Sequence, residues 1–134
     1  MIRALLFTCI LGCCFLAKAQ EPKFIQHELG DANIGITINT ILQDYQSMIW
    51  LGTDAGLARY DGTNWDTLVL PTNNEHNITS LYEDHRNRLW VGTKLGEIFY
   101  LDKARQPKLF DIEEGLPKVP IKAIGEDNEG QLWF

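Results

Sequence analysis

Cysteine is absent from most of this 134-residue sequence, because Cys9, Cys13 and Cys14 are its only cysteines and all lie near the start. Residues 20–134 therefore hold no thiol, which excludes disulfides and thiolate catalysis there. Histidine is scarce as well, and its three residues are too scattered for the ligand spacing of a metal site. The Gly-x-x-x-x-Gly-Lys motif that cradles phosphates does not occur. We expect no catalytic residue, no metal and no cofactor in this chain, and the identity of any ligand-binding residue is left open.

Basic residues are also few. The sequence has 12 Lys and Arg against 18 Asp and Glu, a formal net charge of −6, and no basic cluster. Nucleic acids and anionic lipid surfaces bind proteins largely through such clusters. We therefore expect no nucleic acid to bind this region.

Long apolar runs are limited to one, Ala4–Leu16, which is shorter than the roughly 20 residues of a membrane-spanning helix. Arg3 precedes this run, and the small residues Ala17 and Ala19 follow it, which is the layout of a secretory signal peptide. The sequence thus predicts a signal peptide over residues 1–19, removed after Ala19. A buried core helix and a lipid-modified Cys13 are the alternatives.

A repeat dominates the remainder. Three aspartates each precede a tryptophan by six residues, at intervals of 40 and 43: Asp44 and Trp50, Asp84 and Trp90, Asp127 and Trp133. Apolar residues recur six and three positions before each aspartate: Ile38 and Ile41, Ile78 and Leu81, Ile121 and Ile124. After the first two tryptophans, four residues match at one offset: Gly52, Thr53, Gly56 and Tyr60 with Gly92, Thr93, Gly96 and Tyr100. So many matches at one offset indicate a structural repeat.

Each repeat unit reads as four short strands, because β-branched and aromatic residues alternate with polar turn residues. In the first unit these strands are residues 38–42, 48–52, 57–60 and 65–70. The aspartate begins a turn whose fourth residue is Ser47, Asn87 or Gly130, and Gly and Asn tolerate the left-handed conformation there better than Ser. Gly56 and Gly96 are expected at positive φ in the next turn.

Four short strands in roughly 40–50 residues is the period of a β-propeller blade. We therefore predict an all-β fold of antiparallel four-stranded propeller blades, with no helix in residues 20–134. The predicted parts are a lead-in strand at 20–35, blades at 36–76 and 77–119, and the start of a further blade at 120–134. Two blades and part of a third cannot close a ring, so we expect a fragment of a longer protein. The repeated tryptophans are expected to pack between blades, and an aromatic ligand platform is the alternative.

These residues resemble the two-component regulator propeller repeat. Trp50–Gly62 follows its pattern of Trp, hydrophobic residue, Gly-Thr, then Gly-Leu and an aromatic, and residues 114–117 resemble its link between blades. Two departures stand out: Glu97 where the repeat has leucine, and a link over Pro71–Asn77 without Gly-Leu-Pro.

The resemblance implies the sensing half of a membrane-bound sensor, often a hybrid histidine kinase, on the periplasmic side of the inner membrane of a Gram-negative bacterium. It also implies an unknown small-molecule or glycan ligand and a dimeric, membrane-anchored parent that is itself the kinase, whereas this region is no enzyme. A structural or adhesive exported propeller is one alternative. A sialidase-like glycosidase is another, although its motif places Asp five residues before Trp.

Other polar residues are expected to be unremarkable. His27 precedes Glu-Leu, as the phosphorylated histidine of kinases does, but Gly30-Asp31-Ala32 follows it and no helical pattern surrounds it. His76 and His85 fall in polar, turn-like segments and are expected to be solvated. Glu113-Glu114 and Glu126-Asp127 are expected to be solvated turn acids rather than a catalytic pair.

Overall fold

The computed structural model describes residues 37–111, 115 and 118–134, and within them every regular element is a β-strand. The strands are β1 Ile38–Gln43, β2 Ile49–Thr53, β3 Leu57–Tyr60, β4 Trp65–Leu68, β5 Ile78–Glu83, β6 Leu89–Thr93, β7 Ile98–Leu101, β8 Pro107–Phe110, β9 Gly125–Glu126 and β10 Leu132–Trp133. The predicted signal peptide, the lead-in strand, His27 and Glu113-Glu114 lie outside the described residues.

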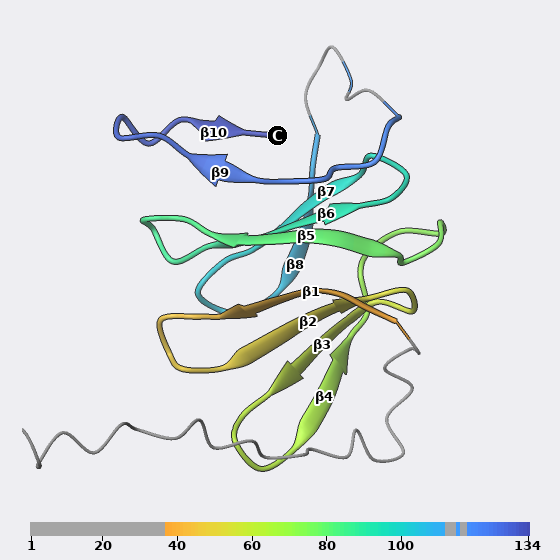
Figure 1. Cartoon of the computed structure of the whole chain (residues 1–134), viewed down its shortest axis with the longest axis vertical. Coiled ribbons are helices and arrows are strands. Elements are labelled where there is room, and N and C mark those ends of the chain that lie inside the picture. Colours follow the sequence, from red (N-terminus) through yellow and green to blue (C-terminus); the bar gives the residue numbers. More distant parts are fainter. Residues whose placement is uncertain (1–36, 112–114, 116–117) are drawn as a thin grey trace, which may run out of the picture.

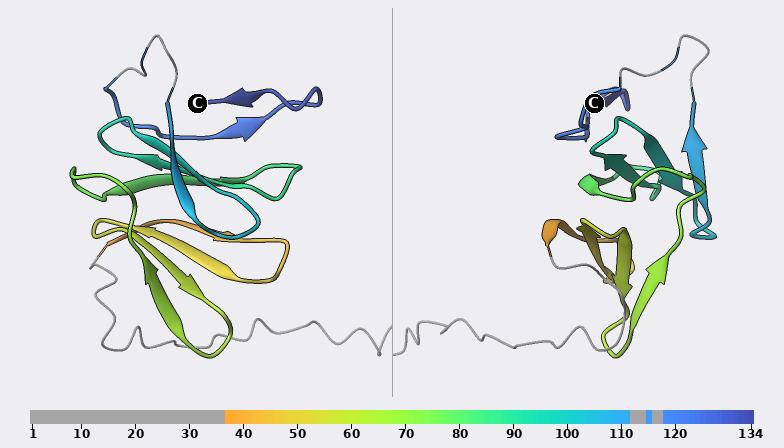
Figure 2. Two further views of the ribbon diagram at one scale, coloured as in Figure 1. Left: turned by 180° about the vertical axis from the view of Figure 1, so that it is seen from behind. Right: turned by 90° about the vertical axis from the view of Figure 1, so that its right-hand side faces the viewer.

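The strands form three antiparallel sheets. Strands β1 to β4 pair in chain order to make blade one, β5 to β8 do the same for blade two, and β9 pairs with β10 in a third unit. The sheets are stacked face against face in chain order (Figures 1 and 2). The described fold is thus an incomplete β-propeller of two four-stranded blades and the two-stranded start of another.

The aspartate turns have the backbone that the sequence predicts. Ser47, Asn87 and Gly130 have φ of 65°, 61° and 81°, and each amide donates back to the aspartate carbonyl three residues earlier. Gly56 and Gly96 also have positive φ. Two residues without the freedom of glycine thus adopt the left-handed conformation, which shows that the turn is imposed by its surroundings as well as by its own sequence.

Most of the core lies between blades. We call the side of each sheet that faces the preceding unit its incoming face, and the opposite side its outgoing face. Trp50 and Leu57 on the outgoing face of blade one pack with the incoming face of blade two, contributed by Leu89, Val91, Phe99 and Leu101, all of which are buried. Leu70, expected in the fourth strand, follows β4 instead and is buried in this same core. Burial of apolar area between sheets is therefore what holds the blades together.

The third unit repeats this arrangement against blade two. Trp90 and Ile98 on the outgoing face of blade two pack with Ile121, Ile124 and Leu132. Trp90 also contacts Tyr100 and Phe110 through ring faces and edges, at centroid distances of 5.4 and 5.2 Å. Both described junctions thus have one tryptophan at their centre.

The strand register corrects one part of the predicted repeat. The amide of Thr53 donates to the Gly56 carbonyl, whereas that of Thr93 donates to the carbonyl of Glu97. The turn between β6 and β7 therefore holds one more residue than the turn between β2 and β3. The extra residue lies within Lys94–Gly96, because Glu97 has the position of Gly56 and buried Ile98 has that of Leu57.

The same insertion makes the match of Tyr60 with Tyr100 wrong by one residue. Tyr100 pairs with Trp90 across the strands, and the residue that pairs with Trp50 is Arg59. Because a shift of one residue moves a side chain to the other face of a sheet, the two tyrosines point in opposite directions. Tyr60 stacks on Trp65 at 4.7 Å instead.

Candidate functional site

Each aspartate of the repeat binds its own tryptophan, and Asp44 and Asp84 are buried. In blade one, Asp44 Oδ1 accepts the amides of Gln46 and Met48, while Oδ2 accepts the indole N–H of Trp50 at 2.8 Å. The corresponding indole bonds join Trp90 to Asp84 at 2.8 Å and Trp133 to Asp127 at 3.0 Å. One carboxylate therefore both closes the turn and orients the aromatic ring, and we call this arrangement the Asp–Trp clasp.

Electrostatics favour the ionised form of the clasp in blade two. Burial by itself would raise the pKa of Asp84, but hydrogen bonds from the Trp90 indole and from the backbone and guanidinium of Arg88 outweigh it, so the pKa lies below its ordinary value. Arg88 Nε approaches Oδ2 to 2.6 Å. The buried carboxylate is thus paired rather than reactive, as a structural role requires.

The junction between blades one and two is closed by Arg105, a residue that the sequence does not single out. Arg105 lies after β7 of blade two with φ of 56°, and its Nη2 reaches Asp44 Oδ2 of blade one at 2.7 Å. It also approaches Glu83 at 3.5 Å and lies over the Trp50 ring. The Glu83 carboxylate in turn accepts the amide of Tyr45 at 2.8 Å.

The next junction repeats the glutamate contact, with a histidine in place of the arginine. Glu126 Oε2 accepts the amide of His85 at 2.9 Å, and Oε1 contacts the imidazole Nδ1 of the same residue. The prediction of a solvated turn acid is therefore wrong for Glu126, whose side chain is 7% exposed, whereas the side chain of His85 is 54% exposed, as predicted. His76 is half-buried, and its Nε2 lies 3.4 Å from the carbonyl oxygen of Thr72.

The glycines of the repeat let the innermost strand of one blade approach the next. A Cβ on Gly52 would lie 2.6 Å from Ile78 Cγ2, and one on Gly92 would lie 2.6 Å from Ile121 Cγ2. No side chain fits in that space. These positions are thus explained by packing between blades.

The threonines that follow these glycines are also structural. Thr53 and Thr93 are fully buried, and each hydroxyl bonds within the turn that follows its strand. The alternative of an aromatic ligand platform is excluded for Trp50 and Trp90, which are 0% and 2% exposed, whereas Trp133 is 64% exposed. The repeat motif of blades one and two therefore builds the scaffold.

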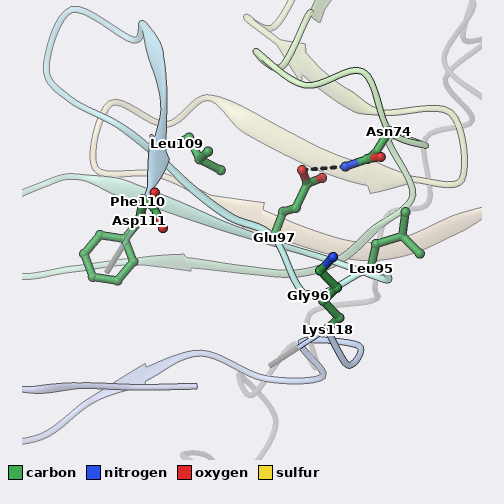
Figure 3. A pocket seen from close by; sticks show the side chains of 8 residues that line it. All are labelled: Asn74, Leu95, Gly96, Glu97, Leu109, Phe110, Asp111 and Lys118. Atoms are coloured by element: carbon green, nitrogen blue, oxygen red, sulfur yellow. Dashed lines mark hydrogen bonds between the residues drawn. The ribbon is translucent and has the colours of Figure 1, made fainter. Parts of the chain in front are cut away.

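A cavity lies at the end of blade two, where the β6–β7 turn meets both connections between blades (Figure 3). Its volume is about 320 Å³, and it is lined by Asn74, Leu95, Gly96, Glu97, Leu109, Phe110, Asp111 and Lys118. Glu97, the last residue before β7, accepts hydrogen bonds from Thr72 and Asn74 at 2.8 and 2.9 Å. The two departures from the repeat, Glu97 and the Pro71–Asn77 link, thus bind each other and shape one wall of this pocket.

The pocket combines amide, carboxylate and ammonium groups with apolar side chains, which suits binding of a small polar molecule. In the described part of the chain, no group of three or more His, Cys, Asp or Glu side chains is placed to hold a metal ion. Within the same residues, no helix is long and apolar enough to cross a membrane.

Comparison with known proteins agrees with this architecture. Residues 73–94 match the family model described as two component regulator propeller. The matched segment covers β5 and β6 with the clasp of Asp84 and Trp90, so the resemblance inferred from the sequence is confirmed for this repeat.

Among solved structures, eleven chains match. One is the extracellular domain of BT3049 from B. thetaiotaomicron, described as a hybrid two component system, with a TM-score of 0.57 and 24% sequence identity. The alignment covers 72% of this chain and 14% of that one, and the likeness shows a shared fold. No curated protein matches the sequence.

Proposed function

We propose that this chain is a ligand-sensing region of a two-component receptor and that it acts outside the cytoplasm. The observation that carries the proposal is the two component regulator propeller match at residues 73–94, which falls on a blade whose repeat geometry is complete. The neighbouring structure, described as the extracellular domain of a hybrid two component system, supports it. So does the predicted signal peptide.

In this proposal the parent is a membrane-anchored, dimeric hybrid histidine kinase of a Gram-negative bacterium, and the propeller lies on the periplasmic side of the inner membrane. The propeller performs no chemistry itself. Ligand binding shifts the equilibrium between two conformations of the receptor. The size of this shift is limited by the difference between the ligand's binding free energies for the two conformations. His27 is not the phosphorylated residue, because it would lie on the side of the membrane without ATP.

The pocket beside Glu97 is where we place the ligand. Its polar side chains, Asn74, Glu97, Asp111 and Lys118, can donate to and accept from hydroxyl groups, and Leu95 and Leu109 add apolar surface. A small glycan offers both kinds of group, hydroxyls at its rim and C–H faces between them. Carbohydrates are therefore the class of ligand to test first.

The test uses the gene in its native cell. Codons 37–134 are deleted in frame, and transcripts are profiled during growth on a panel of single glycans. We expect one gene set to lose its induction by one glycan, and the control substitution His27→Ala to keep that induction. Transcript profiles that match the parent strain on every glycan would contradict the sensor proposal and favour the structural or adhesive alternative.

A further inference from the structure

We infer that the ligand of the pocket beside Glu97 carries a positive charge, as the protonated amine of an amino sugar does. The inference deepens the proposed function and rests on it, because it takes this pocket as the ligand site. It follows from the balance of charge on the pocket wall, and it separates amino sugars from neutral and acidic ones.

The carboxylate of Glu97 has only neutral partners. Its Oε1 accepts the hydroxyl of Thr72 and the side-chain amide of Asn74, whereas Oε2 is buried and has no hydrogen-bond partner. Figure 3 shows this side chain at the pocket with its bond to Asn74. Within the described residues, no basic side chain forms an ion pair with Glu97. A half-buried carboxylate is thus left without a compensating charge, which is unfavourable away from water.

Other buried and half-buried carboxylates of the two blades are compensated. Asp44 and Glu83 both meet the guanidinium of Arg105. Asp84 meets that of Arg88. The cost of removing a charge from water is offset in each case by a partner of opposite sign. The acid at the pocket lacks such a partner, and a cation on the ligand would supply it.

The pocket wall as a whole carries an excess of negative charge. Among its described lining residues the ionisable ones are Glu97, Asp111 and Lys118, two carboxylates and one ammonium. Whichever carboxylate Lys118 approaches, the other remains uncompensated. Inside a pocket this charge is screened less by water than on an open surface, so it attracts cations and repels anions more strongly. A protonated amine is therefore favoured, and an acidic sugar is disfavoured.

The remaining walls suit the rest of an amino sugar. The side-chain carbonyl of Asn74 can accept a hydroxyl of the ligand. Leu95 and Leu109 are 43% and 47% exposed, and they offer apolar surface to the C–H face of a pyranose. The cavity volume of about 320 Å³ is small for a ligand site, which favours a ligand of about one sugar unit. One hydroxylated ring with an ammonium group thus matches both kinds of wall.

Binding of matched pyranoses to the full chain, followed by NMR titration, tests the inference. The series is glucose, glucosamine, N-acetylglucosamine and glucuronate, with the corresponding galactose series beside it, so that the charge changes on one ring. We expect the amine to bind about tenfold or more tightly than the neutral sugars, because hydrogen bonds between charged groups are the stronger ones. The acidic sugar should bind most weakly.

Two variants show whether Glu97 is the source of this preference. Glu97→Gln removes the charge but keeps a carbonyl oxygen that can accept from Thr72 and Asn74, so the link stays in place. In this variant the amine should bind about as tightly as the neutral sugar, whose own affinity changes little. Glu75→Gln is the matched control, because Glu75 is an exposed acid of the same link that does not line the pocket. Here the preference for the amine should persist.

The outcomes separate this inference from the proposed function. Neutral or acidic sugars that bind as tightly as the amine, or a preference that survives Glu97→Gln, would overturn the inference and leave the pocket as a sugar site. If no member of either series binds, the pocket is not the ligand site, and the inference falls together with that part of the proposed function.

Discussion

The carboxylate of Asp84 accepts the indole N–H of Trp90 at 2.8 Å, six residues further along the chain. The spacing that defines the repeat in the sequence therefore has a physical origin. One carboxylate oxygen closes the turn between two strands, and the other fixes the ring that packs against the next unit. A residue of another type at either position would lose one of these two functions.

Replacement of Asp84 by alanine should destabilise the chain strongly. The change leaves the Trp90 indole, two backbone amides and the Arg88 guanidinium without their acceptor, and removal of one partner from a buried charged pair costs about 3–5 kcal/mol. Urea unfolding measures the loss. The control is Asp61→Ala, because Asp61 caps an exposed turn and binds no tryptophan. Equal losses in the two variants would contradict the role of the clasp.

The contribution of Asp84 should depend on pH. Its pKa in the folded chain lies below the ordinary value of 3.8, so the unfolded state binds more protons in the window between the two values. The stabilisation is then complete above about pH 4 and is lost as the pH falls through the folded pKa. The difference in unfolding free energy between the parent chain and Asp84→Asn, measured in urea from pH 7 downward, should shrink below about pH 4. A difference that stays constant with pH would argue against it.

Glu97 should control the order of the link between blades one and two. Its carboxylate binds Thr72 and Asn74, so Glu97→Ala should speed hydrogen exchange at residues 72–77 and leave the strands of blade one unchanged. Exchange followed by mass spectrometry measures this, with Glu97→Gln as the variant that retains an acceptor. Unaltered exchange in the link after Glu97→Ala would show that the link is held by other contacts.

Export should remove residues 1–19. Arg3, the apolar run and the small residues at 17 and 19 form a signal peptide in the sequence. N-terminal sequencing of the protein from the periplasm should begin at Gln20. A product that retains Met1, or one that carries lipid on Cys13, would show that this prediction is wrong.

The strands and turns follow from the sequence because they depend on local features. Alternating apolar residues predict β1 to β4 closely, and the aspartate turns predict positive φ even at Ser47 and Asn87. The extra residue in the β6–β7 turn is not apparent in the sequence, because Gly56 and Gly96 match at an offset of 40 whereas the strands that follow them are displaced by one residue.

Contacts between blades are harder to infer, because they join residues far apart in the chain. Arg105 is a surface turn residue by pattern, and only the stacking of two sheets places its guanidinium beside Asp44. The burial of Asp44 itself is unexpected for the same reason, as a turn aspartate is ordinarily solvated. The pocket likewise depends on how the Pro71–Asn77 link lies against Glu97.

The central claim is that the repeated tryptophan packs between consecutive blades. Urea unfolding of Trp90→Ala, compared with Trp65→Ala, tests this claim most directly. Trp90 is 2% exposed at a junction, whereas Trp65 is only half-buried on the outermost strand of blade one. Loss of a buried tryptophan costs about 3–5 kcal/mol, so Trp90→Ala should lower the free energy of unfolding by that amount and Trp65→Ala by clearly less. Equal losses for the two variants would contradict the assignment of Trp90 to the junction.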